Sequence, residues 1–362
     1  MSGESLGTSS SESSVPSGPS ASSVPDAAGS GAAGAVASAP RAGSRPLIQL
    51  ADEAGRVRYE LPEEVAQGRE GAVAAAVARA DDLRAALRLA TAALNKAGVD
   101  SPRADAELLA AHLLGEDRGR IAVRALMGEP VPAGFGELVQ ARADRVPLQH
   151  LTGTAPFRGL ELAVGPGVFV PRPETELVAG AAIEEAARLT RPVVVDLCTG
   201  SGAIAAAVAA EVPAARVTAV ELSDVAASWA GRNLADTDVR LLLGDARELP
   251  QDLDGAADVV VSNPPYVPAG RAHDAEAATD PATALYGGGA DGMELPSALI
   301  ARAATLLTDA GLLVMEHDET QEEAMRAALS GWDEVQVHRD LTGRIRFSTA
   351  RRAARAAHPV GE

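Results

Sequence analysis

From residue 174 onward, short apolar runs rich in β-branched residues alternate with Ala-rich segments, and this alternation constrains the fold most strongly. The apolar runs are typical of buried strands and the segments between them of helices. Such alternation predicts an α/β fold with a doubly wound, mostly parallel sheet of seven strands. The expected strands lie within 192–200, 215–223, 239–246, 257–266, 311–317, 334–340 and 344–351.

Polar and Gly-rich motifs follow the first three expected strands, at the edge where sheets of this class bind ligands. The first strand runs into "DLCTGSGAIA", in which Gly200 and Gly202 allow close approach to a ligand beside a helix N-terminus. Its spacing differs from the G-x-G-x-x-G of NAD-binding proteins. Glu221 ends the second strand and can accept both hydroxyls of a ribose. Asp245, after the third strand, could meet an adenine amino group. Together these motifs predict a nucleotide-type ligand.

The fourth strand ends in "NPPY", residues 263–266. Two prolines cannot continue a hydrogen-bond ladder, so this strand end needs a rigid backbone with free carbonyls. The Asn263 side-chain oxygen and the Pro264 carbonyl are two acceptors that could hold both hydrogens of a planar nitrogen. This arrangement is suited to orienting an amide or amino group beside the ligand.

Composition narrows the function classes. With 32 basic and 50 acidic residues, the net charge of −18 argues against a surface that coats phosphates. A single Cys excludes an internal disulfide framework and fits a reducing cytosol. We find no apolar run long enough for a membrane span, no signal peptide, and no metal-ligand spacing among the His and Cys residues. We therefore expect a cytoplasmic protein without a metal site.

Before the α/β region the chain changes character twice. Residues 1–70 begin with Ser, Gly, Ala and Pro and cannot bury enough surface to order, so we expect a disordered or weakly ordered tail. Residues 71–148 show helical periodicity, with a stop at Gly98 and a further helix that starts near Pro102 and ends at Gly115.

The remaining boundaries follow from Gly and Pro punctuation. Residues 149–171 show two short alternating runs, which predict a β-hairpin linker. Residues 172–355 form the expected ligand-binding α/β domain, and 356–362 a C-terminal tail.

Further motifs then occur in a fixed order along the chain. They are "DSPRADAELLAAHLLG", "PLQHLTGTAPFRGLEL", "FVPRPETELV", "NPPYVP", "PATALYGGGADGM", "MEHDETQ" and "RDLTGRIRF". From about 75 to 352 this series resembles the peptide chain release factor N5-glutamine methyltransferases, a family of class I S-adenosylmethionine-dependent methyltransferases. The resemblance implies S-adenosylmethionine as cofactor and a helical domain that recognises the substrate. It also implies methylation of the Gln in the Gly-Gly-Gln motif of class 1 release factors. Separately, we expect a monomer that binds no nucleic acid directly.

The resemblance carries over to particular residues. It implies that Tyr266 packs on the planar group being methylated and that the loop around Arg172 lines the cleft. The expected catalytic residues are Asn263, Pro264 and Tyr266, and the expected substrate contacts are Asn263, Pro264, Pro265, Tyr266 and Arg172. The expected cofactor contacts are Asp196, Cys198, Thr199, Gly200, Ser201, Gly202, Glu221, Asp245, Ala246 and Asn263.

Two positions depart from the family pattern. Cys198 and Asp318 stand where the family commonly has Gly. We interpret Cys198 as a small buried side chain facing the donor, not as a nucleophile, since no His lies beside it in sequence. Asp318 puts only the local turn in doubt.

Three other functions fit parts of the pattern. A DNA or RNA amino-methyltransferase could use the same Asn-Pro-Pro-Tyr site on a flipped base, but it would need a Lys- and Arg-rich reading module, which we do not find in 72–150. A glutamine methyltransferase for another protein shares every motif above. A non-catalytic binding module would not need the intact Gly200, Glu221 and Asn263.

Overall fold

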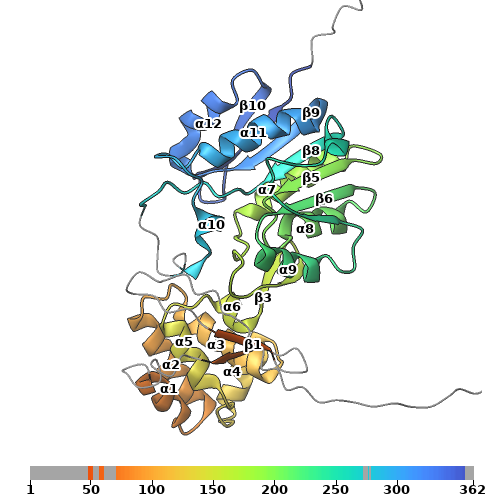
Figure 1. The fold of residues 1–362 in the computed structure, drawn as a ribbon. Coiled ribbons are helices and arrows are strands. Elements are labelled where there is room, and N and C mark those ends of the chain that lie inside the picture. Colours follow the sequence, from red (N-terminus) through yellow and green to blue (C-terminus); the bar gives the residue numbers. More distant parts are fainter. Residues whose placement is uncertain (1–47, 52–56, 61–70, 272–275, 277–278, 355–362) are drawn as a thin grey trace, which may run out of the picture. The chain divides into compact units, whose positions relative to one another are not determined.

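The computed structural model describes residues 48–51, 57–60, 71–271, 276 and 279–354 (Figure 1). The expected tails, 1–70 and 356–362, lie outside the described residues except for two short strands. These are β1 (Ile48–Ala51) and β2 (Val57–Glu60), which pair antiparallel. Both strands fall within the expected tail, 1–70, for which the sequence predicts no strand.

Seven strands form one mixed sheet in the order β10-β11-β9-β8-β5-β6-β7, which confirms the expected fold class. The five strands β5 to β9 run parallel, whereas β11 pairs antiparallel with both β9 and β10. The strands are β5 (Val193–Leu197), β6 (Arg216–Glu221), β7 (Arg240–Leu243), β8 (Ala257–Ser262), β9 (Leu307–Glu316), β10 (Asp333–Arg339) and β11 (Ile345–Arg351).

Side chains alternate between the two faces of this sheet because successive residues of a strand point in opposite directions. Val259 and Val261 pack with α7, α8 and α9, whereas Val260 packs with α11 and α12. Buried alanines of α8 give that helix a flat inner surface, so an aromatic-poor chain still closes its core. The helices are α7 (Thr175–Ala186), α8 (Ala203–Glu211), α9 (Asp224–Asn233), α10 (Ala282–Leu285), α11 (Glu294–Leu306) and α12 (Glu322–Ala328). Two short 3₁₀ turns are η1 (Gln251–Leu253) and η3 (Glu319–Gln321).

The order of the strands places a topological switch point at β5. From β5 the chain builds outward through β6 and β7, and it then returns to add β8 on the other side of β5. The loops that leave β5 and β8 therefore diverge, and their carboxyl ends border a crevice of the kind that binds ligands in such sheets.

Six helices in the N-terminal part of the described chain share a separate apolar core. Asp82 caps the second of them by accepting a hydrogen bond from Ala85 N at 2.7 Å, so the helical periodicity before Gly98 belongs to two helices. The expected ends at Pro102 and Gly115 are confirmed. The helices are α1 (Gly71–Ala78), α2 (Leu83–Lys96), α3 (Pro102–Leu114), α4 (Arg118–Leu126), α5 (Phe135–Ala143) and α6 (Leu148–Thr152).

The expected hairpin is present but shorter than 149–171. Strands β3 (Thr154–Phe157) and β4 (Leu160–Ala163) pair antiparallel around Arg158 and Gly159, which both have positive φ, as a tight two-residue turn requires. The start of the expected range is wrong, because Pro147 leads into α6 and the left-handed Gly153 ends it.

No helix in the described part of the chain combines the length and the apolar character that a bilayer span needs.

Candidate active site at the carboxyl ends of the parallel strands

A cavity of about 600 Å³ opens where β5, β6, β7 and β8 end. Pro281, residues 283–288, Phe169 and Thr175 also contribute to its wall. The expected site residues that line it are Cys198, Thr199, Gly200, Ser201, Glu221, Asp245, Ala246, Asn263, Pro264, Pro265 and Tyr266. Asp196, Gly202 and Arg172 are not part of this wall.

The Gly turn after β5 rests on Asp196. The buried Asp196 Oδ2 accepts hydrogen bonds from the Thr199 hydroxyl and, at 3.2 Å, from Ala205 N in the first turn of α8. Burial raises the pKa of Asp196 to about 7, although these two hydrogen bonds lower it. Asp196 therefore supports the turn from beneath. It does not line the cavity, although the sequence predicted it as a cofactor contact. Gly202, with φ of 82°, forms the left-handed N-cap of α8.

Cys198 has the backbone conformation of a glycine. Its φ is 60°, in the left-handed region that costs a residue with a side chain roughly 1–2 kcal/mol. The thiol lines the cavity, and its pKa is raised by burial and further by the nearby carboxylates, Glu221 first among them. A protonated thiol is a poor nucleophile, so the geometry supports the expected packing role.

Glu221 holds the Gly turn and the start of α9 together at the end of β6. Its Oε2 accepts a hydrogen bond from Gly200 N and its Oε1 one from Ser223 N, both at 2.8 Å. Burial raises the pKa of this carboxyl, and the backbone N–H donors oppose that rise. Asp245 has a different environment: the Arg247 guanidinium binds its carboxylate at 2.6 Å and lowers its pKa. Glu221 is thus fixed by backbone N–H groups, whereas Asp245 accepts hydrogen bonds from both the backbone N–H and the exposed side chain of Arg247.

The Asn-Pro-Pro-Tyr loop after β8 is tied to β9 through polar side chains. Asn263 Nδ2 donates to Thr175 Oγ1 at 3.0 Å, and the Thr175 hydroxyl donates to Glu316 Oε2 at 2.8 Å. The Tyr266 hydroxyl donates to Glu316 Oε1 at 3.1 Å. The buried Glu316 carboxylate at the end of β9 therefore holds Tyr266 directly and Asn263 through Thr175.

The backbone of the same loop is clamped by Gln321. Its Nε2 donates to the carbonyls of Tyr266 and Asp291, both at 2.7 Å. Gly292 packs so closely that a Cβ there would lie 2.1 Å from the Tyr266 carbonyl oxygen. The loop has little room to move, because its carbonyls are contacted by two segments that follow it in sequence.

Asp318 gives the turn before Gln321 a defined structure. Its side chain accepts a hydrogen bond from Thr320 N, and Gln321 Oε1 accepts one from Asp318 N, which together form a capping box. Arg271 also pairs with this carboxylate at 3.0 Å. The departure at Asp318 therefore strengthens the turn that positions the Gln321 clamp.

Arg172 contacts protein groups just outside the cavity. Its guanidinium pairs with the buried Asp280 carboxylate at 3.0 Å and lies 5.0 Å from the centre of the Phe169 ring. Phe169 and the segment after Asp280 both line the cavity. Arg172 thus braces the wall, and its direct contact with a substrate stays a prediction.

Comparison with known proteins follows the same division of the chain. A "PrmC N-terminal domain" model matches residues 85–153, and a "Methyltransferase domain" model matches 194–289. A release factor glutamine methyltransferase from Mycolicibacterium smegmatis is 51% identical over 76% of this chain and 99% of its own length. The chain belongs to the release factor glutamine methyltransferase family. Relatives of the same name from Streptomyces coelicolor and Corynebacterium glutamicum are 48% and 47% identical, over 75% and 74% of this chain and 98% of each relative.

Enzymes of this family use S-adenosylmethionine as methyl donor, and the cavity wall fits that molecule. The Glu221 carboxylate accepts hydrogen bonds from Gly200 N and Ser223 N, and a carboxylate has about four lone-pair positions, so acceptor capacity remains for a ribose diol. A Cβ on Gly200 would meet no atom within 4 Å, so the backbone at the turn directly borders open space. Among the residues with described side chains, no group of three or more His, Cys, Asp or Glu is arranged to hold a metal ion.

Three residues of this release factor glutamine methyltransferase site were missing from the sequence prediction. They are Thr175, Glu316 and Gln321, which fix the Asn-Pro-Pro-Tyr loop. Glu316 did carry a signal, since an acidic residue ends the fifth expected strand just as Glu221 ends the second. Thr175 carried no such signal, because it is the first residue of α7, and only the fold brings it to Asn263.

Proposed function

We propose that this chain transfers the methyl group of S-adenosylmethionine to the side-chain amide nitrogen of the Gln in the Gly-Gly-Gln motif of class 1 release factors. The observation that carries the proposal is the fixed Asn-Pro-Pro-Tyr loop at the cavity, with the Asn263 amide oriented by Thr175. The names of the relatives, which the chain matches over nearly their whole length, support the same substrate.

In this proposal the strand ends of β5, β6 and β7 hold the donor. Glu221 accepts the ribose hydroxyls, and the backbone of the Gly200 turn lies against the methionyl part. Ala246 and Asp245 border the adenine, where the Arg247 pair leaves the Asp245 carboxylate partly exposed. When bound, S-adenosylmethionine supplies an electrophilic methyl group on a positively charged sulfur.

The loop after β8 holds the amide to be methylated. Because Asn263 Nδ2 is engaged by Thr175, Oδ1 is the end of the side chain that can accept a substrate hydrogen. The Pro264 carbonyl provides the second acceptor, and the ring of Tyr266 packs on the amide plane. An amide nitrogen is a weak nucleophile because its lone pair is delocalised, and its reaction therefore depends on exact orientation. Two acceptors that hold both hydrogens align the nitrogen with the methyl group. Positioning, without a covalent intermediate, accounts for the catalysis, and the nitrogen loses one of its two hydrogens as a proton when it gains the methyl group.

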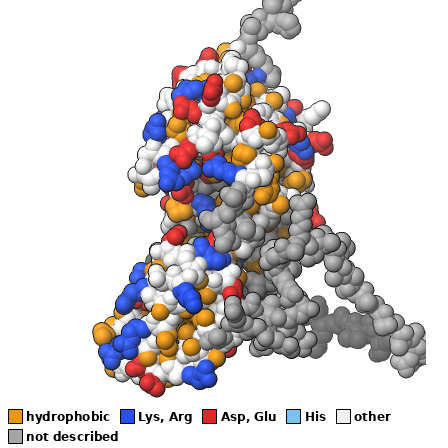
Figure 2. Space-filling model, turned by 90° about the vertical axis from the view of Figure 1, so that its left-hand side faces the viewer, with side chains coloured by type: hydrophobic (Ala, Val, Ile, Leu, Met, Phe, Trp, Pro, Cys, Tyr) orange, Lys and Arg blue, Asp and Glu red, His pale blue; other side chains and the backbone are white. Residues whose placement is uncertain are grey.

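The helical elements α1–α6 are proposed to recognise the release factor. Two of their arginines are neutralised by carboxylates, since Arg118 pairs with Glu107, and Arg124 with Glu116 and Glu129. On the face shown in Figure 2, basic side chains are scattered among apolar and acidic ones. With the net charge of −18, this favours a protein partner over a nucleic acid. We expect a cytoplasmic monomer.

The test is methyl transfer to purified release factor, followed by mass spectrometry of the peptide that contains Gly-Gly-Gln. The expected product carries one added methyl group on that Gln, and a release factor with Gly-Gly-Ala in its place should remain unmodified. A DNA or RNA oligonucleotide and a bacterial protein extract serve as competing substrates. Methylation of an adenine or guanine, or of Gln only in another protein, would overturn the assignment.

A further inference from the structure

Glu316 lies beside Asn263 because of the pairing of β8 with β9. These strands run parallel, and Ser262 is opposite Met315, so Asn263, just after β8, and Glu316, the last residue of β9, lie at the same edge of the sheet. Glu316 is 3% exposed, and its two oxygens accept hydrogen bonds from Thr175 and Tyr266. It lies behind the cavity wall and does not line it.

When Glu316 is ionised, each hydrogen bond in this network has only one possible donor and one possible acceptor. An ionised carboxylate can only accept hydrogen bonds, so the single hydroxyl hydrogen of Thr175 points to Glu316. Thr175 Oγ1 can then only accept from Asn263, which turns the Asn263 NH₂ group toward Thr175. The Asn263 oxygen is consequently the end left for the cavity. A neutral group at 316 would allow the Thr175 hydroxyl to reverse and the Asn263 amide to flip.

We propose that Glu316 is a positioning residue for methyl transfer, which fixes the amide orientation of Asn263 through Thr175 and the ring of Tyr266 through its hydroxyl. The inference rests on the proposed function, since it assigns to Asn263 Oδ1 the role of holding the substrate amide. Glu316 acts through other residues and does not touch the substrate.

A purely structural role accounts poorly for a carboxylate at this place. Among the described residues Glu316 makes no ion pair, and two hydroxyl groups are its hydrogen-bond donors. Burying a charge on hydroxyl donors alone is unfavourable, and an amide or apolar side chain would fill the same space at lower cost. Burial raises the pKa of Glu316 to about 7; nearby Glu174 raises it and Arg346 lowers it. Arg346 itself is bound by Asp340 at 2.9 Å.

The proposal predicts an acidic limb in the pH profile. Below about pH 7 the Glu316 carboxyl becomes protonated and can donate a hydrogen bond. The Thr175 hydroxyl is then no longer forced to donate to Glu316, so the rate of methyl transfer should fall with falling pH. In Glu316→Gln the rate should be low at every pH, and this limb should be absent.

The experiment measures single-turnover methyl transfer to release factor at saturating donor, between pH 6 and 9, together with donor affinity by calorimetry. Glu316→Gln and Thr175→Val should each lose about 10- to 100-fold in rate. Donor affinity should stay within about twofold. Thr175→Ser keeps the hydroxyl and should retain most of the rate. The double variant should be no slower than the slower single variant, because both changes break the same chain.

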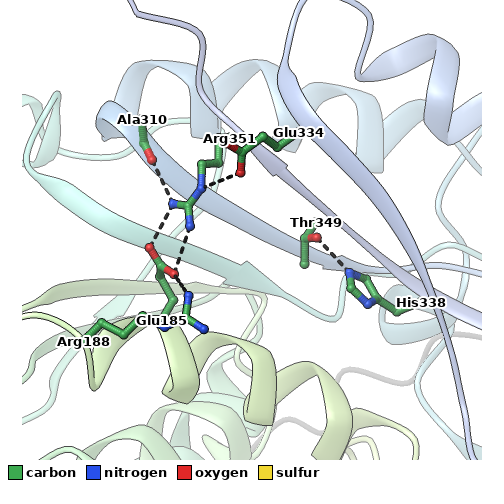
Figure 3. A network of polar contacts seen from close by, with 7 residues as sticks. All are labelled: Glu185, Arg188, Ala310, Glu334, His338, Thr349 and Arg351. Carbon is green, nitrogen blue, oxygen red and sulfur yellow. Dashed lines mark hydrogen bonds and ion pairs between the residues drawn. The ribbon is translucent and has the colours of Figure 1, made fainter.

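A matched control is Glu185→Gln on α7. Glu185 is also a carboxylate with two hydrogen-bonding partners, Arg351 and Arg188 (Figure 3), and it does not line the cavity. This variant should keep the wild-type rate and pH profile. It separates loss of a carboxylate in general from loss of the one at 316.

Three results would overturn the inference. The first is a near-wild-type rate with an intact acidic limb in Glu316→Gln. The second is a double variant whose rate loss is the product of the losses in Glu316→Gln and Thr175→Val. The third is a rate loss that is fully explained by weaker donor binding. Should Glu316→Gln fail to fold, Thr175→Val against Thr175→Ser decides: equal rates would overturn it. Absence of any transfer by the wild-type protein would instead reject the proposed function.

Discussion

At the scale of single residues, the site depends on side chains whose orientation is set by neighbours. Asn263 is oriented by Thr175, and Glu221 is fixed by two backbone N–H groups. Cys198 occupies a backbone conformation that ordinarily suits glycine. These three positions make separable predictions, because they affect amide orientation, donor binding and backbone strain respectively.

Asn263→Ala should reduce single-turnover methyl transfer about 10²- to 10³-fold, the loss typical of one preorganised hydrogen-bond partner at a reacting centre. Donor affinity should change little, since Glu221 and the Gly200 turn remain. Asn263→Asp should retain partial activity, because it keeps an acceptor but loses the NH₂ group that binds Thr175. Glu221→Ala is the converse control and should lose roughly 1.5–3 kcal/mol of donor binding. A near-wild-type rate for Asn263→Ala would contradict the assignment.

At position 198, Gly should give a more stable protein than Ala. At most positions a protein with Ala is at least as stable as one with Gly, but at a φ of 60° the Cβ is strained. We therefore expect the unfolding free energy of Cys198→Gly to exceed that of Cys198→Ala by about 1 kcal/mol. Both variants remove the thiol, so their difference in denaturant unfolding isolates the backbone. Both should still transfer methyl groups, and inactivity of the two would point to a chemical role for the thiol.

At the scale of elements, the loop after β8 is rigid because later segments hold its backbone. Gln321, in the turn between β9 and α12, donates to the Tyr266 and Asp291 carbonyls, and Asp318 orders that turn. The prolines alone remove N–H donors and fix φ, but they do not determine where the carbonyls point. The clamp supplies that second constraint.

Replacing the clamp should loosen the loop and weaken the fold. Gln321→Leu leaves two carbonyls without their donor, so we expect a loss of about 1–3 kcal/mol in unfolding free energy. Methyl transfer should slow more than donor binding weakens. Glu319→Gln, an exposed change in the same turn at a side chain with no hydrogen bond among the described residues, should alter stability by at most about 0.5 kcal/mol. Equal behaviour of the two variants would contradict the clamp.

At the scale of the whole molecule, the α/β core contains two buried carboxyls whose pKa values are both raised to about 7. Asp196 and Glu316 lie at the carboxyl ends of β5 and β9, and burial is the main cause for each. Such groups bind protons more readily in the folded than in the unfolded chain. Their contribution to stability is therefore fully present below the unfolded pKa and is lost as the pH rises through about 7. His150, whose pKa burial lowers to about 4, acts in the opposite direction.

The histidines contribute equally to the pH dependence of stability in a Glu316 variant and in the wild type, so the difference between the two proteins does not contain their contribution. Relative to wild type, Glu316→Gln should gain stability as the pH rises from 5 to 8, by up to about 3 kcal/mol. The measurement is denaturant unfolding of both proteins across this range, without donor or release factor. A difference that does not change with pH would show that Glu316 titrates normally. Glu185→Gln, whose carboxyl has a lowered pKa, should show no such gain.

Sequence determined the features that depend on neighbouring residues along the chain. Continuous apolar runs that alternate with helical segments predicted the α/β class, because the strands of a parallel sheet are buried on both faces. The Gly turn, Glu221 and the Asn-Pro-Pro-Tyr loop were placed at one edge of the sheet, since parallel strands share the direction of their carboxyl ends. Helix ends at Pro102 and Gly115 followed from the backbone limits of those two residue types.

The tertiary structure alone decided which side chains meet. Thr175 and Asn263 are 88 residues apart, and Thr175 and Glu316 are 141 apart, so no local pattern links them. Asp196 looked like a ligand contact because it precedes the Gly turn, but the turn folds over it and buries it. Hydrogen-bond partners at such separations depend on strand order and packing, which the pairing of β8 with β5 and β9 sets in three dimensions.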